Sequence, residues 1–439
     1  MITAEMNRRL TQVGPGTPGG ALLRRYWQPI ALREEMEGPR PVRPVRVLGE
    51  DLVLFRDDEG RLGLIDRGCP HRGVDLAYGR LEDGGLRCPF HGWLFAHDGR
   101  CLETPGEPEG TTLHTRVRTR SYAVTERSGI VWAYLGQGEA PAFPAFDCFV
   151  APESHVFAFK GLISCNWLQA LEVGIDPAHA SFLHRFFDDG DGKDSYGVQF
   201  RANSDGSDLP MTYVMREYAR PRIEVENADW GLRLTALRTV SDTVTHVRIT
   251  NLYFPQAFVI PMSPTMTITQ WHVPVDDTRC YWVAIFTSFA EPVDHAKMRR
   301  DRLEAYSLPD YVPKKGAQNN YGFDPHEQET ATYTGMGMDI NVHDQWAVES
   351  MGAIQDRTKE HLASTDKAIA ANRRLLLRAM EALEEGRAPL MATPEAAGLT
   401  GPATIDGMAP AERWQAHWRD AVARRRHAAP WGAPALAAE

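Results

Sequence analysis

The sequence has few of the features that mark secreted, membrane or nucleic-acid-binding proteins. Its 439 residues include six cysteines, scattered without the close spacing of a small disulfide-bonded domain. No run of about eighteen apolar residues is present, and the first residues hold no apolar stretch of signal-peptide length. The net charge is −10 and no basic run stands out, which argues against nucleic-acid binding. We therefore expect a cytoplasmic protein with no nucleic-acid or membrane partner.

The sequence also lacks a credible nucleotide-binding loop. Gly14, Gly16 and Gly19 satisfy the pattern G-x-G-x-x-G. However, no strand precedes them, Pro15 and Pro18 interrupt the motif, and no βαβ unit follows. We expect a flexible loop here, after a short helix at residues 3–13. A redox reaction in this chain would then need electrons from a separate protein.

Two cysteine-histidine pairs dominate the first third of the chain. Cys69 and His71 are separated by one residue, Cys88 and His91 by two, and sixteen residues lie between the pairs. This donor set suits a [2Fe–2S] cluster in which two histidines replace two cysteines on one iron, or a structural zinc. Zinc fingers usually keep both cysteines ahead of both histidines, whereas each pair here is mixed. The order favours the iron–sulfur cluster, and zinc stays open as the alternative.

A second group of metal-binding side chains follows in the stretch NWLQALEVGIDPAHASFLH. Asp176, His179 and His184 form D-x-x-H-x-x-x-x-H, and two histidines with a carboxylate from elsewhere can hold Fe(II). Positions five apart point about 140° away from each other on a regular α-helix. We therefore expect the helix to bulge, kink or end near His184. Two hydrogen-bonded histidines without a metal remain the alternative.

The remaining periodicity predicts strands. Short β-rich runs flank the cysteine-histidine pairs, and a glycine- and proline-rich stretch at 136–146 is typical of a linker. Alternating apolar runs within 210–290 predict an antiparallel sheet, and further helices follow. We expect an N-terminal segment at 1–44, a β domain at 45–150, a catalytic domain at 151–390 and a C-terminal extension at 391–439.

These motifs together resemble one family. The segments VGPGTPGG, RRYWQPI, NWLQALEVGIDPAHASFLHR and HDQWAVESMGAIQDRTKEHL, with the cysteine-histidine stretch, are similar to the oxygenase component of Rieske non-haem iron oxygenases. The similarity is greatest to the phthalate dioxygenase group, which includes aromatic O-demethylases. It implies an α+β protein, with a Rieske β domain and a helix-grip catalytic domain whose curved antiparallel sheet surrounds an iron-binding helix.

The resemblance also implies residue roles. Cys69, His71, Cys88 and His91 would bind the [2Fe–2S] cluster, and His179, His184 and Asp344 would bind a mononuclear Fe(II). Asp339 and Asp356 remain candidates for the third ligand. His343 replaces a residue that is often glutamine in the group, and it would lie behind the ligands or compete with them. Val173, where Asn or Gly is more usual, leaves Glu172 without an expected polar role.

The same resemblance assigns Asp176 a catalytic role between the two metal centres. It would accept one hydrogen bond from His179 and another from His91 of a neighbouring subunit, in a homotrimer or a dimer of trimers. Asn166 and Arg238 are the predicted substrate contacts, with Arg238 chosen from several arginines at positions 216–238. Residues 186–197 are predicted to form a surface loop or lid.

The implied function is that of a terminal oxygenase. Electrons from an NADH-dependent reductase, directly or through a ferredoxin, and dioxygen would hydroxylate a small aromatic acid of the phthalate or benzoate type. O-demethylation of a methoxylated, lignin-derived aromatic acid is the alternative activity. A Rieske electron-transfer protein without catalysis is the alternative of another class.

Overall fold

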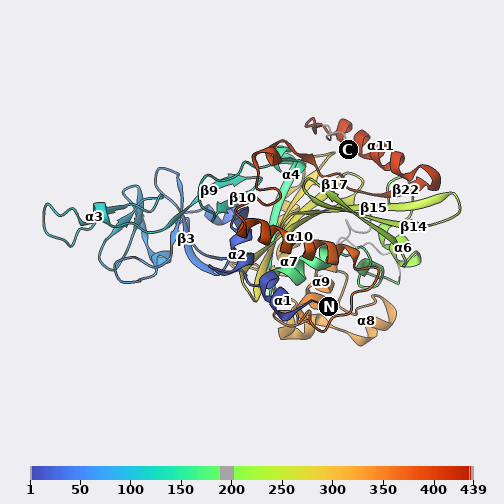
Figure 1. Cartoon of the computed structure of the whole chain (residues 1–439), viewed down its shortest axis with the longest axis horizontal. Coiled ribbons are helices and arrows are strands. Elements are labelled where there is room, and N and C mark those ends of the chain that lie inside the picture. The colour runs from blue at the N-terminus through green and yellow to red at the C-terminus, as the bar shows by residue number, and fades with distance from the viewer. Residues whose placement is uncertain (1, 188–201, 435, 437–439) are drawn as a thin grey trace.

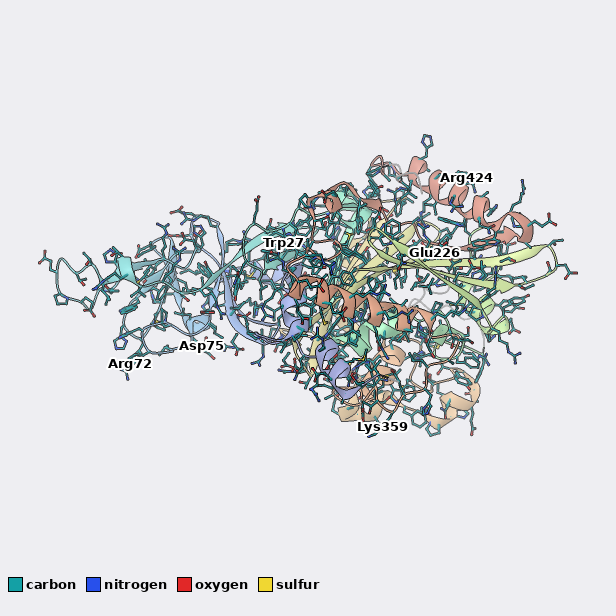
Figure 2. All side chains as sticks on the ribbon, viewed as in Figure 1. Trp27, Arg72, Asp75, Glu226, Lys359 and Arg424 are labelled. Carbon is teal, nitrogen blue, oxygen red and sulfur yellow. The ribbon has the colours of Figure 1, made fainter. Side chains whose placement is uncertain are left out.

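The computed structural model describes residues 2–187, 202–434 and 436. An elongated β domain extends from a larger sheet-and-helix domain, and α3 (Leu113–Arg116) lies at its far end (Figure 1). Arg72 and Asp75 lie on this projecting part, far from Glu226 and Arg424 on the larger domain (Figure 2). No helix in the described parts of the chain has both the length and the apolar character needed to cross a bilayer.

The projecting domain is built from two antiparallel sheets. The six-stranded sheet has the order β1-β10-β9-β4-β3-β2, and the four-stranded sheet has the order β5-β6-β7-β8. The strands of the first are β1 (Trp27–Leu32), β2 (Val42–Val47), β3 (Glu50–Arg56), β4 (Leu62–Asp66), β9 (Ser121–Arg127) and β10 (Ile130–Tyr134). Those of the second are β5 (Arg80–Glu82), β6 (Gly85–Arg87), β7 (Leu94–Phe95) and β8 (Cys101–Glu103).

The larger domain contains an antiparallel sheet in the order β12-β18-β17-β16-β15-β14-β13, with β22 also paired to β15. Its long strands carry β-branched and aromatic residues, as expected from the sequence. They are β12 (Val156–Ile163), β13 (Arg222–Ala228), β14 (Gly231–Thr239), β15 (Val244–Tyr253), β16 (Ala257–Ser263), β17 (Met266–Asp276), β18 (Arg279–Ser288) and β22 (Ile405–Pro410).

Helices cover this sheet and close its ends (Figure 1). The α-helices are α1 (Ala4–Thr11), α2 (Pro18–Leu23), α4 (Asp147–Val150), α5 (Trp167–Gly174), α6 (Met211–Glu217), α7 (His295–Ala305), α8 (Pro325–Thr330), α9 (Ile340–Glu349), α10 (Lys367–Glu384) and α11 (Trp414–Ala428). Short strand pairs join β11 (Ala145–Phe146) to β21 (Thr400–Gly401) and β19 (Tyr306–Ser307) to β20 (Val312–Pro313).

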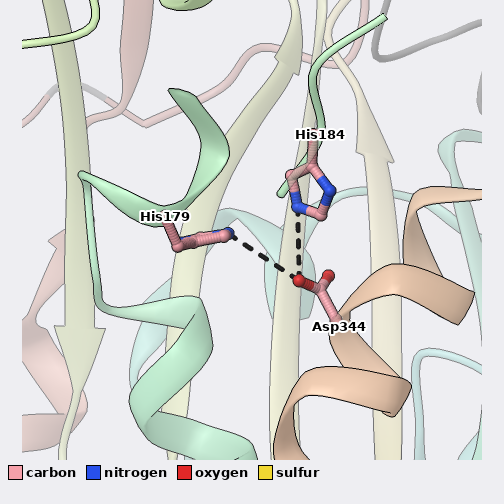
Figure 3. Close-up of side chains that lie close together, drawn as sticks. All are labelled: His179, His184 and Asp344. Atoms are coloured by element: carbon pink, nitrogen blue, oxygen red, sulfur yellow. Dashed lines mark ion pairs between the residues drawn. The ribbon is translucent and has the colours of Figure 1, made fainter. Parts of the chain in front are cut away.

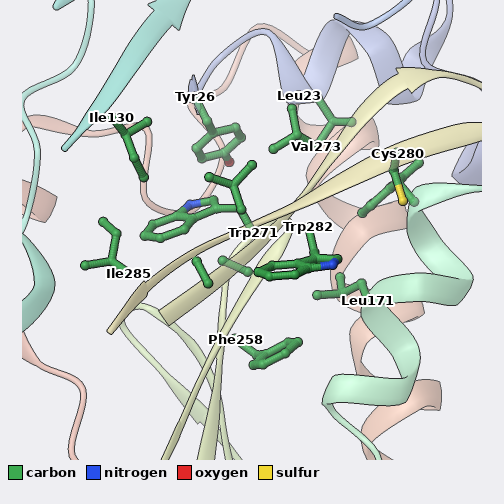
Figure 4. Close-up of a cluster of buried hydrophobic side chains, with 14 of the residues drawn as sticks. Leu23, Tyr26, Ile130, Leu171, Phe258, Trp271, Val273, Cys280, Trp282 and Ile285 are labelled. Atoms are coloured by element: carbon green, nitrogen blue, oxygen red, sulfur yellow. The ribbon is translucent and has the colours of Figure 1, made fainter. Parts of the chain in front are cut away.

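One apolar core joins the two domains. It combines side chains from α2, β10, α5 and the large sheet, including Leu23, Ile130, Leu171 and Trp271, and Figure 4 shows them around the crossing strands. Leu171 places the buried face of α5 against the sheet, close to Trp282. The α5 helix is therefore fixed by packing, and the chain that leaves its C-terminal end has a defined starting point.

Several local expectations differ from the structure. The glycine-rich segment is not a loop throughout, because Thr17 caps α2 and Pro18 occupies its first turn. A helix, α1, precedes this segment where a nucleotide fold would have a strand. β1 was not predicted, since Pro29 interrupts its pattern. Proline is tolerated there because β1 is an edge strand with a register shift after Pro29.

The C-terminal segment packs on its own chain. In α11, Trp418, Ala421 and Val422 are buried against Leu237 and Val247 of the large sheet. The helix α10 begins after Asp366. At the other end of the chain, β1 within the expected N-terminal segment pairs with β10 of the β domain. The four-part division at 44, 150 and 390 stays a prediction.

Candidate functional site

Two equivalent loops at the tip of the β domain present the first set of metal-binding side chains. In each loop the amide of the cysteine donates to the carbonyl five residues later, and its carbonyl accepts from the glycine four residues later. Gly73 and Gly92 have φ values of +79° and +75°, which favour glycine. Repetition of the same turn brings Cys69 and Cys88 to corresponding places in the two loops.

The donor set of these loops fits a two-iron cluster. Both thiols are buried, and burial raises the pKa of Cys69 to about 11, so its thiolate requires a compensating cation. The His71 and His91 rings lie 4.5 Å apart between centroids, and His71 stacks on Trp93. The buried Nδ1 of His91 has no hydrogen-bond partner among the described residues. Two sulfurs and two ring nitrogens are thus available for ligation.

A single zinc ion fits less well. Zinc bonds of about 2.0–2.3 Å in a tetrahedron would draw all four donor atoms within about 4 Å of one another. Within the described ranges, the one group of three or more potential ligands that converges within 4.8 Å lies elsewhere in the chain. The four side chains are spread more widely than one ion requires, which favours the larger cluster.

The converging group consists of His179, His184 and Asp344. Oδ1 of Asp344 lies 3.8 Å from Nε2 of His179 and 3.2 Å from Nε2 of His184. Figure 3 shows both rings directed toward the carboxylate, which is carried by α9. Among the three carboxylates considered from the sequence, Asp339 caps α9 and Asp356 binds Thr358 in an exposed turn, so Asp344 alone meets the two histidines.

The expected break in the histidine-bearing helix is present, but it comes earlier than His184. α5 ends at Gly174, where a side chain would clash with the Phe258 ring, and Pro177 follows. His179 begins a short 3-10 helix, η4 (His179–Ser181), and His184 lies beyond it. Because the chain leaves the α-helical path, two positions five apart can face the same point.

Hydrogen bonds fix which nitrogen of each histidine carries its proton. Nδ1 of His179 lies 2.5 Å from the Asp176 carbonyl, so it donates. Nε2 of His343 donates to the Gly337 carbonyl at 2.8 Å, and burial lowers the pKa of His343 to about 4, so that its Nδ1 is an acceptor at neutral pH. Nδ1 of His184, 3.5 Å away, is then the donor. Both Nε2 atoms at the centre keep their lone pairs.

Three electron-pair donors therefore face one another. The lone pairs of His179 and His184 meet the Asp344 carboxylate, and no hydrogen-bond donor from the described residues reaches its buried Oδ1. Such a group repels itself unless a cation binds between its members. Two imidazoles and one carboxylate are the donors preferred by non-haem Fe(II).

The other predicted site residues lie around this centre in different roles. The Asp176 carboxylate accepts from the Ala178 amide, and its backbone carbonyl, instead of the expected carboxylate, binds His179. Asn166 caps α5 and is fully buried, and its side-chain amide donates to the carbonyls of Thr11 and Asp277. The structure does not bring Asn166 to the metal-binding group.

Arg238 is buried behind the ligand segment. Its Nη2 lies 3.3 Å from the Pro177 carbonyl and 3.4 Å from Oγ of Ser181, on either side of His179 in the chain. Burial lowers the pKa of Arg238 to about 10. Arg238 contacts the segment that carries His179 and does not line the cavity beside the metal-binding group.

That cavity has a volume of about 110 Å³ and adjoins His179, His184 and Asp344. Its walls are mostly apolar, with side chains that include Met215, Ala236, Phe258, Ile260 and Ile268, and it also contains Arg248, Gln270 and Asn341. Sequence reasoning missed Arg248, although its place in an alternating strand pattern was a usable signal. The predicted loop at 186–197 lies, from residue 188 onward, outside the described residues.

A second, larger hollow of about 630 Å³ also adjoins Asp176 and His179. Phe182 and Tyr333 line it and are about half exposed, at 49% and 46%. Glu172, Glu360 and Arg373 contribute charged groups to its wall. Asp176 therefore contributes to the walls of both the small cavity and this open hollow.

Comparisons with known proteins agree with this arrangement. Residues 26–123 match the Rieske [2Fe–2S] domain, and residues 133–428 match the LigXa C-terminal domain like family. The chain is 34% identical over 407 residues to the phthalate 4,5-dioxygenase oxygenase subunit of Pseudomonas putida, covering 89% of each. It is 33% identical over 395 residues to the 5,5'-dehydrodivanillate O-demethylase oxygenase subunit of a Sphingobium species, covering 89% of this chain and 83% of the relative.

A solved structure shares the fold. The NdmA QL mutant of Pseudomonas putida CBB5 with theobromine superposes with a TM-score of 0.55 at 17% identity, covering 86% of this chain and 96% of that one. The α+β architecture inferred from the sequence is thereby confirmed. The chain belongs to the Rieske non-haem iron oxygenases, in which it is an oxygenase subunit and an oxidoreductase whose cofactors are a Rieske [2Fe–2S] cluster and a mononuclear iron.

Proposed function

We propose that this oxygenase subunit hydroxylates a small aromatic carboxylate of the benzoate or phthalate type. The observation that carries the proposal is Arg248, a guanidinium in the apolar cavity beside His179, His184 and Asp344. A planar guanidinium suits a carboxylate, and apolar walls suit an aromatic ring. The first relative is named for an aromatic dicarboxylate, phthalate, which agrees with this substrate class.

The proposed ligands follow from the geometry of each group. Cys69, His71, Cys88 and His91 would hold the cluster, and His179, His184 and Asp344 would hold the iron. When bound, the two groups supply electron storage and a site for dioxygen activation.

The protein's own side chains prepare the small cavity. Phe258, Ile260 and Ile268 exclude water and pack on the ring of the substrate, while Arg248 fixes its carboxylate at a distance from the metal ligands. The carbonyls of Asp176 and Gly337 hold the proton-bearing nitrogens of His179 and His343. The lone pairs at the centre are thereby oriented before any ligand binds.

The assembly we propose is a homotrimer or a dimer of trimers in which the β-domain tip of one copy docks beside Asp176 of the next. Two observations support it. The cluster loops lie on a domain that projects away from the catalytic sheet (Figure 1), and the hollow beside Asp176 exposes Phe182 and Tyr333. Exposed aromatic side chains in a hollow are typical of protein interfaces. Asp176 would then contact His91 of the partner copy.

The electron source we propose is an NADH-dependent reductase, acting directly or through a ferredoxin. The glycine-rich segment that matched a nucleotide motif forms a turn and α2, which supports a separate protein for NADH. A cytoplasmic location also stays a prediction.

Turnover of a substrate panel tests the activity. With a reconstituted reductase and NADH, we expect aromatic carboxylates in the panel to stimulate oxygen uptake, with hydroxylated products identified by mass spectrometry. Formaldehyde from methoxylated acids would favour O-demethylation, which the similarity to the Sphingobium O-demethylase supports. Product-free NADH oxidation with two irons per chain, in place of about three, would point to an electron carrier.

His343 provides a separate prediction about the iron site. Substitution of leucine for His343 removes the acceptor for Nδ1 of His184, and loss of such a supporting contact typically lowers metal affinity by about 10–100-fold. His343→Gln retains an acceptor and a donor and is expected to keep most of the affinity. Titration of the iron-depleted protein with Fe(II) measures this, and equal affinity of the leucine variant and the wild type would contradict it.

A further inference from the structure

The C-terminal strand β22 brings a carboxylate into contact with Arg248, the arginine that lines the substrate cavity. β22 lies beside β15 (Figure 1) and pairs antiparallel with its first half, and the register sets Asp406 opposite Arg248. Directly opposite residues of an antiparallel pair lie on the same face of the sheet. A strand more than 150 positions later in the chain thus supplies the neighbour of the arginine in the cavity.

Three donors surround this carboxylate. Asp406 is 5% exposed and accepts from Nη1 of Arg248 at 2.7 Å, Nε2 of His246 at 2.9 Å and Oγ of Ser204 at 2.6 Å. Burial alone would raise the pKa of Asp406, but His246 and Arg248 hold it well below its usual range. The residue is therefore a carboxylate at neutral pH, held by bonds from separate elements.

Arg248 has donors left for a ligand. Its Nη1 is committed to Asp406 and also lies 3.5 Å from the Met211 sulfur, while Nη2 makes a single long contact of 3.5 Å to the Pro261 carbonyl. Among the described residues that line the cavity, Arg248 is the one arginine or lysine. Asp406 balances the charge of Arg248, and the neighbouring Arg238 does not line the cavity, so the cavity wall itself offers one directed guanidinium donor.

We propose that Asp406 is a positioning residue that aims Arg248 at the substrate and restricts the cavity to aromatic monocarboxylates. The inference rests on the proposed function and narrows it. A ligand with one carboxylate can bind the guanidinium, whereas a second carboxylate would meet no further cation and would be repelled by Asp406. The residue acts through Arg248 and has no contact of its own with the reacting atoms.

Calorimetric binding of benzoate, phthalate and benzamide to the holoenzyme tests this. The wild type is expected to bind benzoate at least about tenfold more tightly than either of the others. Asp406→Asn keeps the shape of the side chain and removes its charge. The affinity for phthalate is therefore expected to rise about tenfold relative to the affinity for benzoate. Benzamide binding and iron content should change by less than about twofold. Glu412→Gln, which removes an exposed charge near β22, is the matched control and should preserve the wild-type ratios.

Asp406→Glu separates charge from position. It should keep the preference for benzoate over phthalate while weakening both, because the longer side chain displaces Arg248. If Asp406→Asn does not fold, loss of that preference in Asp406→Glu would overturn the inference. If Asp406→Asn folds and its ratio of benzoate affinity to phthalate affinity equals that of the wild type, the inference about Asp406 is overturned and the proposed acid substrate is not affected. Wild-type protein that binds benzoate no better than benzamide would overturn the proposed acid substrate as well.

Discussion

Replacing His184 with alanine is expected to remove the mononuclear iron and abolish oxygenation while the [2Fe–2S] cluster remains. His184 is buried, and its Nε2 lies 3.2 Å from the Asp344 carboxylate. A facial triad that loses one imidazole keeps two protein ligands, too few to hold Fe(II) against water. Iron should fall from about three to about two per chain, with acid-labile sulfide constant at about two. Metal analysis and the visible spectrum of the cluster measure both changes in one sample.

The cluster serves as an internal control for this variant, because it lies in loops of the other domain. His427→Ala removes an exposed histidine of α11 and should retain all of the iron and activity. If His184→Ala kept the full iron content, the assignment of the metal ligands would be wrong. If it lost the cluster as well, the two centres would not be structurally independent.

The sequence indicated two metal centres because their chemistry is carried by rare residue types at short spacing, and the individual ligands stay a prediction. Cys69, His71, Cys88 and His91 lie in two turns whose glycines impose the same backbone path. His179 and His184 were singled out in the same way, and the geometry of an α-helix required a break near His184, which the structure places earlier, at Gly174. Short-range patterns of this kind do not depend on how distant segments pack.

Contacts between distant strands could not be predicted. Arg248 and Asp406 meet because β22 pairs with β15, and the proline- and glycine-rich sequence around β22 gives no sign of a strand at the catalytic sheet. Asn166, expected near the substrate, instead caps α5, a common role for asparagine at a helix start. The side chain's type was informative, but its partners were set by tertiary structure.

Glu172 illustrates the same limit. Because Val173 departs from the residue usual in the family, the sequence predicted no polar role for the neighbouring Glu172. In the structure it is 5% exposed and binds Arg373 through two bonds of 2.6 and 2.9 Å and Arg357 at 3.1 Å. Arg373 and Arg357 follow Glu172 by 201 and 185 positions, so no local sequence pattern predicts these contacts. The three side chains join α5 to the segments that follow α9 and form α10.

Glu172→Gln is therefore expected to lower the free energy of unfolding by about 3–5 kcal/mol, because two buried guanidinium groups lose their shared carboxylate. Arg373 keeps its bond to Glu360, which places the expected loss near the lower end of that range, about 3 kcal/mol. For a chain of this size the melting temperature should fall by about 3 °C. Thermal unfolding followed by circular dichroism measures it, and Glu381→Gln on the exposed face of α10 should change stability by less than about 0.5 kcal/mol.

The pH dependence separates this ion pair from a loss of packing. Burial alone would raise the pKa of Glu172, but Arg357 and Arg373 lower it below its ordinary value. A carboxyl whose pKa is lower in the folded state stabilises the protein fully above its unfolded pKa of about 4.3, and this is lost as pH falls through the folded pKa. The deficit of Glu172→Gln should thus be constant between about pH 6 and 8 and shrink below about pH 4. A loss of stability that is equally large at neutral pH and below about pH 4 would mean that the shape of Glu172, and not its charge, holds α5 in place behind the proposed iron ligands.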